Sequence, residues 1–313
     1  MISFKATRDA YGEWLQENGG NKDIVVVDAD LSSSTRTNKF SAKYNERFFD
    51  VGAAEQNLVA FAAGLALGGK KVFASSFAYF MTGRAWDQVR NLVAHDMLDV
   101  QLVASHGGLS CASDGASHQA IEDLAITRVI PNLKVLVPCD AVETKNILNT
   151  LMNIKGPSYL RLRRDKEPIL EKNYDYMLGQ IEIMREGSDI TIAAIGSQVY
   201  NAFLAAEALA EKGVSAEVLN VHTLKPFDKH TLIKSAKKTG RVVTTEQHQI
   251  YGGLGGAIAE VLSENYPISI KIMGVKDTFG ETAREQLEII IHHGLTADNI
   301  VKTSQELINK TRM

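Results

Sequence analysis

The chain has 313 residues, 45% hydrophobic and 23% charged, a balance typical of a soluble globular protein with more than one domain. The formal net charge of -3 gives no electrostatic reason to bind nucleic acid or an acidic membrane surface, so we expect neither partner. Two cysteines, Cys111 and Cys139, are too few for a disulfide framework and fit a reducing compartment. The N-terminal stretch has no apolar core of a signal peptide, and no apolar run reaches the roughly 18 residues that span a bilayer. We therefore expect a cytoplasmic protein.

In the first half of the chain, short β-branched apolar runs alternate with longer segments of helical period. This pattern predicts parallel strands joined by crossover helices. Strands that are apolar almost throughout indicate a sheet covered by helices on both faces. The predicted strands of this half are residues 23–30, 71–77, 99–105, 133–139 and 157–163.

The alternation is lost in a charged stretch and restarts near residue 189. We predict an α/β fold of two domains, residues 1–165 and 189–313, joined by a linker at 166–188. Each domain is expected to be a mostly parallel sheet with helices on both faces. The predicted strands of the second domain are 189–196, 215–222, 240–247 and 268–275, and its predicted helices include 199–213, 256–265 and 304–310.

Glu55 begins a predicted helix that is apolar almost all the way round, in the segment "DVGAAEQNLVAFAAGLAL". An acid in the first turn of a helix can be a simple match to the helix dipole. Among apolar neighbours, however, the carboxyl loses hydration, which favours its protonated form. Glu55 could then share a proton with a basic ring nitrogen of a ligand.

Aromatic residues gather in the segment "SSFAYFMTGRAWDQVRN", which leaves a predicted strand. Most aromatic clusters belong to a hydrophobic core. In an open α/β sheet, however, ligands bind at the loops that follow the strands. A flat ligand ring could therefore stack on Phe77 or Phe80.

His106, Asp114 and His118 lie in the glycine- and serine-rich loop "SHGGLSCASDGASHQAIEDLA". Their spacing, with Cys111 between the histidines, matches no common zinc pattern, so we expect no metal site in this chain. Two imidazoles and a carboxylate suit proton transfer to hydroxyls and carbonyls of a polar substrate. Alternatively, these side chains only satisfy the backbone of their own loop.

Two further segments could bind anions. The strand "YLRLRRDKEP" ends in arginines, which can hold a phosphate through paired hydrogen bonds, and Arg8 and the serines of "DADLSSST" could add donors. The glycines of "YGGLGGAIAEVL" could cradle an anion at a helix start or allow close helix packing, and we favour the packing.

The order of these motifs resembles the C-terminal half of transketolase, over essentially the whole chain. In that family, these segments form the domain that binds the pyrimidine of thiamine diphosphate, followed by a C-terminal domain. The segments that carry the resemblance are "ATRDAYGEWL", "DADLSSS", "DVGAAEQNLVAFAAGLAL", "SSFAYFMTGRAWDQVRN", "SHGGLSCASDGASHQAIEDLAITRVIPNLKVLVPCD", "LNVHTLKPFD" and "TTEQHQIYGGLGGAIAEVL".

The resemblance implies roles for residues that face the cofactor. Glu55 matches the glutamate that protonates the aminopyrimidine of thiamine diphosphate and so promotes removal of the thiazolium C2 proton. Phe77 and Phe80 match aromatics that hold the pyrimidine ring. Asp30 falls where family members contact cofactor and substrate. One ring-contacting aromatic of some members is replaced here by Gly83.

The resemblance also implies substrate contacts. His106 and His118 match histidines that face the sugar, and Asp114 matches the aspartate that reads a substrate hydroxyl. Ser34 falls where family members contact cofactor and substrate. The positions that match the binding site for the sugar phosphate are Arg8, Arg164 and His106.

The "GDG" motif that binds the diphosphate through a metal ion in single-chain transketolases is absent from this sequence. We therefore expect the smaller subunit of a split transketolase, paired in an α2β2 assembly with a chain that binds the diphosphate and its Mg²⁺ or Ca²⁺. The implied reaction moves a two-carbon ketol unit between sugar phosphates, with proton transfers by His106 and His118. The alternatives are an inactive fragment, a 2-oxo acid dehydrogenase β subunit, a 1-deoxyxylulose-phosphate synthase-like enzyme, and a catalytically silent subunit.

Overall fold

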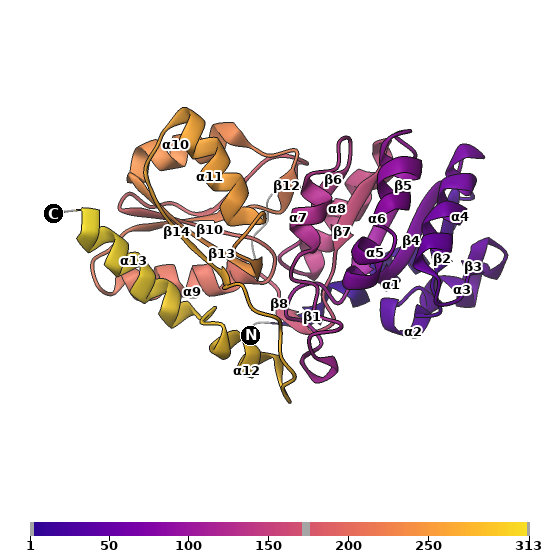
Figure 1. Ribbon diagram of the computed structural model, residues 1–313, viewed down its shortest axis with the longest axis horizontal. Helices are drawn as coiled ribbons and strands as arrows, with labels where there is room; N and C mark the ends of the chain where they lie inside the picture. The colour runs from indigo at the N-terminus through magenta and orange to yellow at the C-terminus, as the bar shows by residue number, and fades with distance from the viewer. Residues whose placement is uncertain (1–2, 171–175, 312–313) are drawn as a thin grey trace.

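The computed structural model describes residues 3–170 and 176–311. These residues form two mostly parallel sheets with helices on both faces, so the predicted α/β fold is confirmed (Figure 1). Both cysteines are buried and unbridged. Within the described ranges, no helix is long and apolar enough to cross a membrane.

The first sheet has seven strands in the order β12-β6-β7-β5-β4-β2-β3. Its central strands are buried along their whole length, which explains their continuous apolar sequence. The five strands predicted for this half are confirmed, and a short strand at each edge was not predicted. The strands are β2 (Ile24–Asp28), β3 (Phe48–Asp50), β4 (Lys71–Phe77), β5 (Val100–Ser105), β6 (Lys134–Leu136), β7 (Ser158–Arg161) and β12 (Thr223–Lys225).

Helices cover both faces of this sheet. Tyr11, Trp14 and Leu15 pack on one face, and Leu58 and Met81 pack on the other. The helical segments of this half are α1 (Thr7–Asn18), α2 (Ser32–Thr35), α3 (Asn38–Tyr44), η1 (Asn45–Arg47), α4 (Glu55–Leu67), α5 (Ala78–Gly83), α6 (Trp86–Gln88), the π-helix η2 (Val89–Ala94), η3 (Ala112–Asp114), α7 (Asp123–Arg128) and α8 (Ala141–Asn153).

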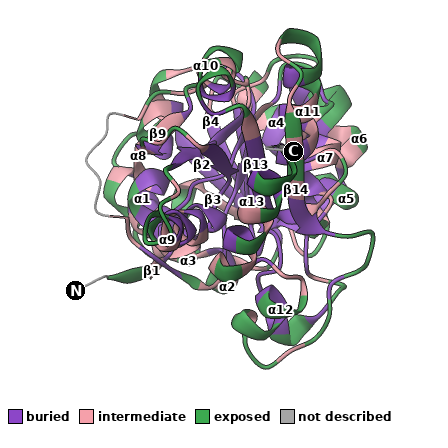
Figure 2. Ribbon diagram, turned by 90° about the vertical axis from the view of Figure 1, so that its left-hand side faces the viewer, coloured by how far each residue is buried: buried purple, intermediate pink, exposed green. Residues whose placement is uncertain are grey.

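The second sheet has five strands in the order β14-β13-β10-β11-β9, and its four predicted strands are confirmed. Its predicted helices are also present, the last as part of a longer helix. The elements are β9 (Glu182–Arg185), β10 (Ile190–Ala194), α9 (Gln198–Ala210), β11 (Ala216–Asn220), α10 (Lys229–Thr239), β13 (Arg241–Gln249), α11 (Leu254–Asn265), β14 (Ser269–Val275), α12 (Gln286–His292) and α13 (Ala297–Thr311). Figure 2 shows the buried strands β2, β4 and β13 behind the more exposed helices.

The predicted linker, residues 166–188, contains regular structure. Its first part forms β8 (Lys166–Pro168), antiparallel to β1 (Phe4–Ala6), and its last part includes β9 at the edge of the second sheet. β12 crosses back from the second half to pair with β6 in the first sheet. The two halves are therefore interlocked by strand pairing, while the exact domain boundaries stay a prediction.

Three of the four glycines in the segment 251–262 pack closely against neighbouring atoms. A Cβ on Gly253 would lie 2.0 Å from Oε2 of Glu246, and one on Gly255 would lie 2.5 Å from Ile272. The buried Glu246 carboxylate accepts hydrogen bonds from the backbone amides of Leu254 and Gly255 at 2.7 and 2.8 Å. The side chain of Glu246 thus occupies the start of α11, where it interacts favourably with the positive end of the helix dipole.

A buried guanidinium joins the two halves. Arg161, at the end of β7, is 2.9 Å from the carboxylate of Asp123, and both side chains are almost fully buried. The same guanidinium donates to the carbonyl oxygens of Ala120 and Gln247, the latter on β13, at 2.6 and 3.0 Å. The hydroxyl of Tyr159 donates to Asp123 at 2.6 Å.

We expect Arg161→Ala to reduce the free energy of unfolding by about 3–5 kcal/mol, because it leaves the Asp123 charge buried and unpaired. Urea unfolding followed by circular dichroism measures this change. The control is Lys145→Ala, whose partly exposed pair with Glu17 is worth about 1 kcal/mol or less. Equal losses in both variants would contradict the role assigned to Arg161.

Candidate active site

Most of the predicted site residues come together at one edge of the first sheet, because neighbouring parallel strands end there. In the register of β4 and β5, Phe77 lies opposite Ser105, and in that of β5 and β7, Ala104 lies opposite Arg161. The loops that follow these strands therefore start side by side, as expected for a binding site of an open α/β sheet.

Two phenylalanines and two histidines form a compact ring cluster. Phe77 and Phe80 stack with their centroids 5.7 Å apart and an interplanar angle of 22°. The ring of His106 lies 3.8 Å from that of Phe77, and the ring of His118 meets Phe80 edge-on at 5.2 Å. Phe77 is 7% exposed, so it forms a wall of the site as well as part of the core. These four predicted residues are thus adjacent in the structure.

Glu55 begins α4, as predicted, and is 4% exposed. One carboxylate oxygen accepts a hydrogen bond from the hydroxyl of Ser76 at 3.3 Å, and the other from Nη1 of Arg84 at 3.2 Å. Ser76 is fully buried, whereas the Arg84 side chain is 55% exposed. The Glu55 carboxylate therefore has one buried partner, Ser76, and one partly exposed partner, Arg84.

Arg84 is a site residue that the sequence analysis missed. Its guanidinium lies 4.2 Å from the centroid of the Phe80 ring while it pairs with Glu55. Its carbonyl oxygen accepts a hydrogen bond from the side chain of Gln56 at 3.1 Å, so the backbone is held. A signal was present in the sequence, since arginine is the cation most often found over an aromatic ring and Arg84 lies four residues after Phe80.

The other aromatics near the glycine at position 83 do not all reach the site. The ring of Tyr79 meets Phe80 edge-on at 5.8 Å. The indole of Trp86 turns away and donates to the carbonyl oxygen of Ile126 at 2.8 Å. Space remains beside Gly83, where an added Cβ would meet no atom within 4 Å. Tyr79, not Trp86, therefore extends the ring cluster.

A second group of predicted residues surrounds His106. Nη1 of Arg8 donates to the carbonyl oxygen of Ser34 at 2.9 Å and lies 3.5 Å from Nε2 of His106. Nδ1 of His106 lies 2.8 Å from the hydroxyl of Ser105. Burial, helped by the positive charges of Arg8 and Arg164, lowers the pKa of His106 to about 3. Its imidazole is therefore neutral at physiological pH.

The loop from residue 106 to 120 holds the remaining predicted residues. Oδ2 of Asp114 accepts a hydrogen bond from Nη1 of Arg164 at 2.9 Å, so these two predicted substrate contacts pair with each other. His106 and Cys111 have left-handed backbone angles, with φ of 62° and 60°. In residues 3–170 and 176–311, no group of three or more His, Cys, Asp or Glu side chains could hold a metal ion.

Asp30 lies apart from these clusters. It follows β2 with φ of 61°, its side chain is exposed, and its backbone amide donates to Oδ1 of Asp50 at 2.9 Å. Within the described ranges, no hydrogen bond or ion pair joins it to the other predicted site residues. The buried acid of this strand is Asp28, which accepts hydrogen bonds from the hydroxyls of Thr35 and Thr37 at 2.7 and 2.8 Å. Asp28 thus organises the turn that presents Ser34.

The lowered pKa of His106 predicts a loss of stability in acid. The unfolded state binds a proton near pH 6.5 and the folded state near pH 3, so the free energy of unfolding falls as the pH drops between these values. At pH 5 the contribution of His106 to this loss is on the order of 2 kcal/mol.

Urea titrations at pH 7.5 and 5 on the protein and on His106→Asn measure this difference. We expect the variant to lose less stability between the two pH values than the unmodified chain. The same replacement of the exposed His95 is the control and leaves the difference unchanged. A His106→Asn variant with the full acid-induced loss would show that His106 does not resist protonation.

Comparison with known families identifies the two halves. Residues 4–168 match the pyrimidine-binding domain of transketolase, and residues 179–300 match the transketolase C-terminal domain. A Methanocaldococcus jannaschii protein named as a transketolase C-terminal section is 45% identical, with 98% of each chain covered. A 6-deoxy-6-sulfo-D-fructose transketolase subunit of a Clostridium species is 42% identical, over 97% of this chain and 94% of that protein.

A solved structure, described as a split-gene transketolase in the form of an inactive β4 tetramer, shows the same fold. It superposes with a TM-score of 0.90 at 45% identity and covers 97% of this chain and 98% of that chain. The chain belongs to the transketolase family and consists of its pyrimidine-binding and C-terminal domains.

Proposed function

We propose that the chain is the C-terminal subunit of a split transketolase that moves a two-carbon ketol unit from a ketose phosphate to an aldose phosphate. The observation that carries this proposal is the buried Glu55 carboxylate beside the stacked rings of Phe77 and Phe80, next to a cluster of histidines and arginines. Relatives that match over nearly their full length are named as a C-terminal section or a subunit, which supports a two-chain enzyme.

The residues present fit the pyrimidine end of thiamine diphosphate. A buried carboxyl can hold a proton toward a ring nitrogen, and exposed parts of an aromatic wall can stack on a flat ring. Glu55 has one partner that solvent can reach, so a ligand can replace Arg84 without stripping Ser76 away. When bound, this cofactor supplies a thiazolium ring that acts as an electron sink. We place the diphosphate and its Mg²⁺ or Ca²⁺ mainly on the partner chain.

The chain's own residues position the substrate and move its protons. The guanidinium groups of Arg8 and Arg164 would bind the sugar phosphate, since arginine donates paired hydrogen bonds to phosphate oxygens. Asp114 and Ser34 would bind sugar hydroxyls. In addition, Asp30 would contact the cofactor or the substrate from the loop after β2.

The two histidines have different environments, which favours different roles. His106 is 2% exposed and neutral, with Ser105 on one ring nitrogen and Arg8 near the other. His118 is half-buried and lies at the edge of the Phe80 ring, with Nδ1 2.9 Å from the hydroxyl of Ser117. We assign His118 to proton exchange with the substrate carbonyl and hydroxyl. His106 would assist this exchange by hydrogen bonding as a neutral imidazole.

Ketol transfer from xylulose 5-phosphate to ribose 5-phosphate tests the proposal. With thiamine diphosphate and Mg²⁺, we expect activity when the chain is mixed with the diphosphate-binding transketolase chain of the same organism, and none from the chain alone. Glu55→Gln should lower the rate by about a hundredfold or more, because a glutamine side chain cannot donate a proton to the pyrimidine ring of the cofactor. The exposed Glu264→Gln, on α11, should leave the rate unchanged.

The same assay separates this proposal from its rivals. Decarboxylation of an oxo acid such as pyruvate by the mixture, without ketol transfer, would indicate a 2-oxo acid dehydrogenase β subunit. Ketol transfer that is unchanged by Glu55→Gln would contradict the role of Glu55, on which the proposal depends.

Arg84 should compete with the cofactor for Glu55. The guanidinium contacts both the carboxylate and the Phe80 ring, the two groups that we assign to the pyrimidine, so a ligand must displace it. We expect Arg84→Ala to lower the Kd of the two-chain complex for thiamine diphosphate, measured by calorimetry. Arg90→Ala, another exposed arginine nearby, should not change that Kd. A higher Kd for Arg84→Ala would instead mean that Arg84 helps to hold the cofactor.

A further inference from the structure

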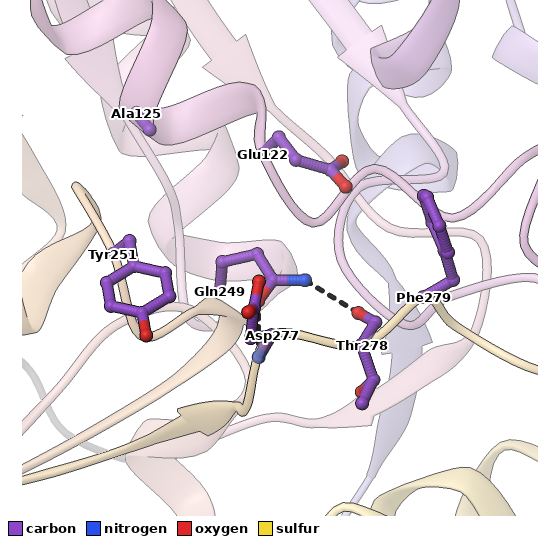
Figure 3. A pocket seen from close by; sticks show the side chains of 7 residues that line it. All are labelled: Glu122, Ala125, Gln249, Tyr251, Asp277, Thr278 and Phe279. Atoms are coloured by element: carbon purple, nitrogen blue, oxygen red, sulfur yellow. Dashed lines mark hydrogen bonds between the residues drawn. The ribbon is translucent and has the colours of Figure 1, made fainter.

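A cavity of about 310 Å³ opens at the junction of the two halves, and we call it the junction pocket. Glu122 and Ala125 reach it from the start of α7 in the first half, and the other lining residues belong to the second half (Figure 3). Those residues are Gln249, Tyr251, Asp277, Thr278 and Phe279.

The floor of the junction pocket is held by hydrogen bonds. The side chain of Gln249 donates to the carbonyl oxygen of Thr278 at 2.7 Å, drawn in Figure 3, and accepts from the backbone amide of Asp277 at 3.0 Å. The backbone amide of Gln249 donates to the carbonyl oxygen of Ile121 at 2.8 Å, which ties this loop to the first half. These hydrogen bonds hold the lining of the pocket in place.

The junction pocket is acidic. Glu122 and Asp277 bring two carboxyl groups to its lining, and no lysine or arginine lines it. In the described part of the chain, neither carboxyl forms an ion pair. Oε2 of Glu122 accepts one hydrogen bond, from the backbone amide of Ile121 at 3.2 Å. Partial burial raises the pKa of Glu122, which shows that its charge lacks full hydration. A cation in the pocket would relieve this cost.

Two exposed aromatic side chains flank the carboxyl groups. Phe279 is 79% exposed and Tyr251 is 62% exposed, values at the high end for large hydrophobic residues of this protein. They lie on opposite sides of Gln249 in Figure 3. Exposed aromatic rings beside carboxylates favour a cationic side chain, which gains both cation–π and ionic contacts. The rings extend beyond the small cavity, as expected for a contact with another protein.

The segment after Phe279 packs against the loop that carries Asp114 and His118. The side chain of Gln119 donates to the carbonyl oxygen of Glu281 at 2.9 Å. The backbone amide of Ala283 donates to the carbonyl oxygen of Ala112 at 3.0 Å. The junction pocket thus adjoins the candidate active site, at whose edge the diphosphate-binding chain has to sit.

We propose that the junction pocket receives an arginine or lysine side chain of the diphosphate-binding chain. This inference rests on the proposed function, because it requires that second chain. Glu122 and Asp277 supply the charge, and Tyr251 and Phe279 cover the inserted side chain.

Calorimetry of the chain with its diphosphate-binding partner tests the proposal. We expect the double variant Glu122→Gln/Asp277→Asn to raise the Kd by about tenfold or more and to weaken the dependence of Kd on salt, because the ionic contact is lost. Phe279→Ala should raise the Kd as well. The matched control, Glu211→Gln/Glu264→Gln, removes two exposed carboxylates elsewhere in the second half and should leave the Kd unchanged. Thermal unfolding of each variant confirms that it is folded.

The possible results separate the two proposals. If the unmodified chains bind each other and the double variant binds equally well, the junction pocket is not the docking site, and the proposed function stands. If the unmodified chains do not associate at all, both proposals fail. A double variant that keeps its Kd for the partner but changes the self-association of the chain, measured by ultracentrifugation, would assign the pocket to a second copy instead.

Discussion

The burial of the Arg161 guanidinium is the constraint on which the site and the domain junction both depend. A charge that loses its hydration must be paired and hydrogen bonded, and Asp123, Ala120 and Gln247 meet that requirement from three different elements. Ala120 ends the loop that carries the histidines, and Gln247 belongs to the second sheet. Arg161 therefore helps to fix both the position of that loop and the docking of the second half. Gly107 fits this arrangement, since a Cβ there would lie 2.5 Å from Cγ of Arg161.

Positive charge dominates the other side of the site. Burial lowers the pKa of His106, and the positive charges of Arg8, Arg164 and Arg36 add to this effect, so the imidazole stays neutral. The same charges make this corner suitable for a phosphate. One cluster of arginines thus supports both the neutral imidazole and the phosphate binding that we propose. Asp114 pairs with Arg164, and because the pair is partly exposed it contributes little to stability.

The central part of the fold could be predicted from the sequence, because strands buried on both faces leave continuous apolar runs. The short strands β3, β8, β9 and β12 could not be predicted in this way. They lie at sheet edges and are only three or four residues long, and pairing with a distant segment makes them strands. The same limit applies to the predicted linker, in which β8 exists because β1 lies beside it.

Site residues that follow buried strands were predictable for a related reason. Phe77 ends β4 and His106 comes directly after β5, and these adjacent parallel strands end together. Arg84 was not predictable as a partner of Glu55, since one residue begins α4 and the other follows α5, and only the packing of these helices brings them within 3.2 Å. The junction pocket depends on contacts between the halves, which no local pattern encodes.

Several side chains near the site have few buried contacts or hydrogen-bond partners within this chain. Glu55 has a buried partner in Ser76 and a second in Arg84, which stands mostly in solvent. Tyr251 and Phe279 expose most of their surface beside two carboxyl groups without an ion pair in the described residues. A protein that worked alone would gain stability by covering such groups itself. Their clustering beside the loop of His118 supports our proposal that a second chain docks on this face and completes the cofactor site.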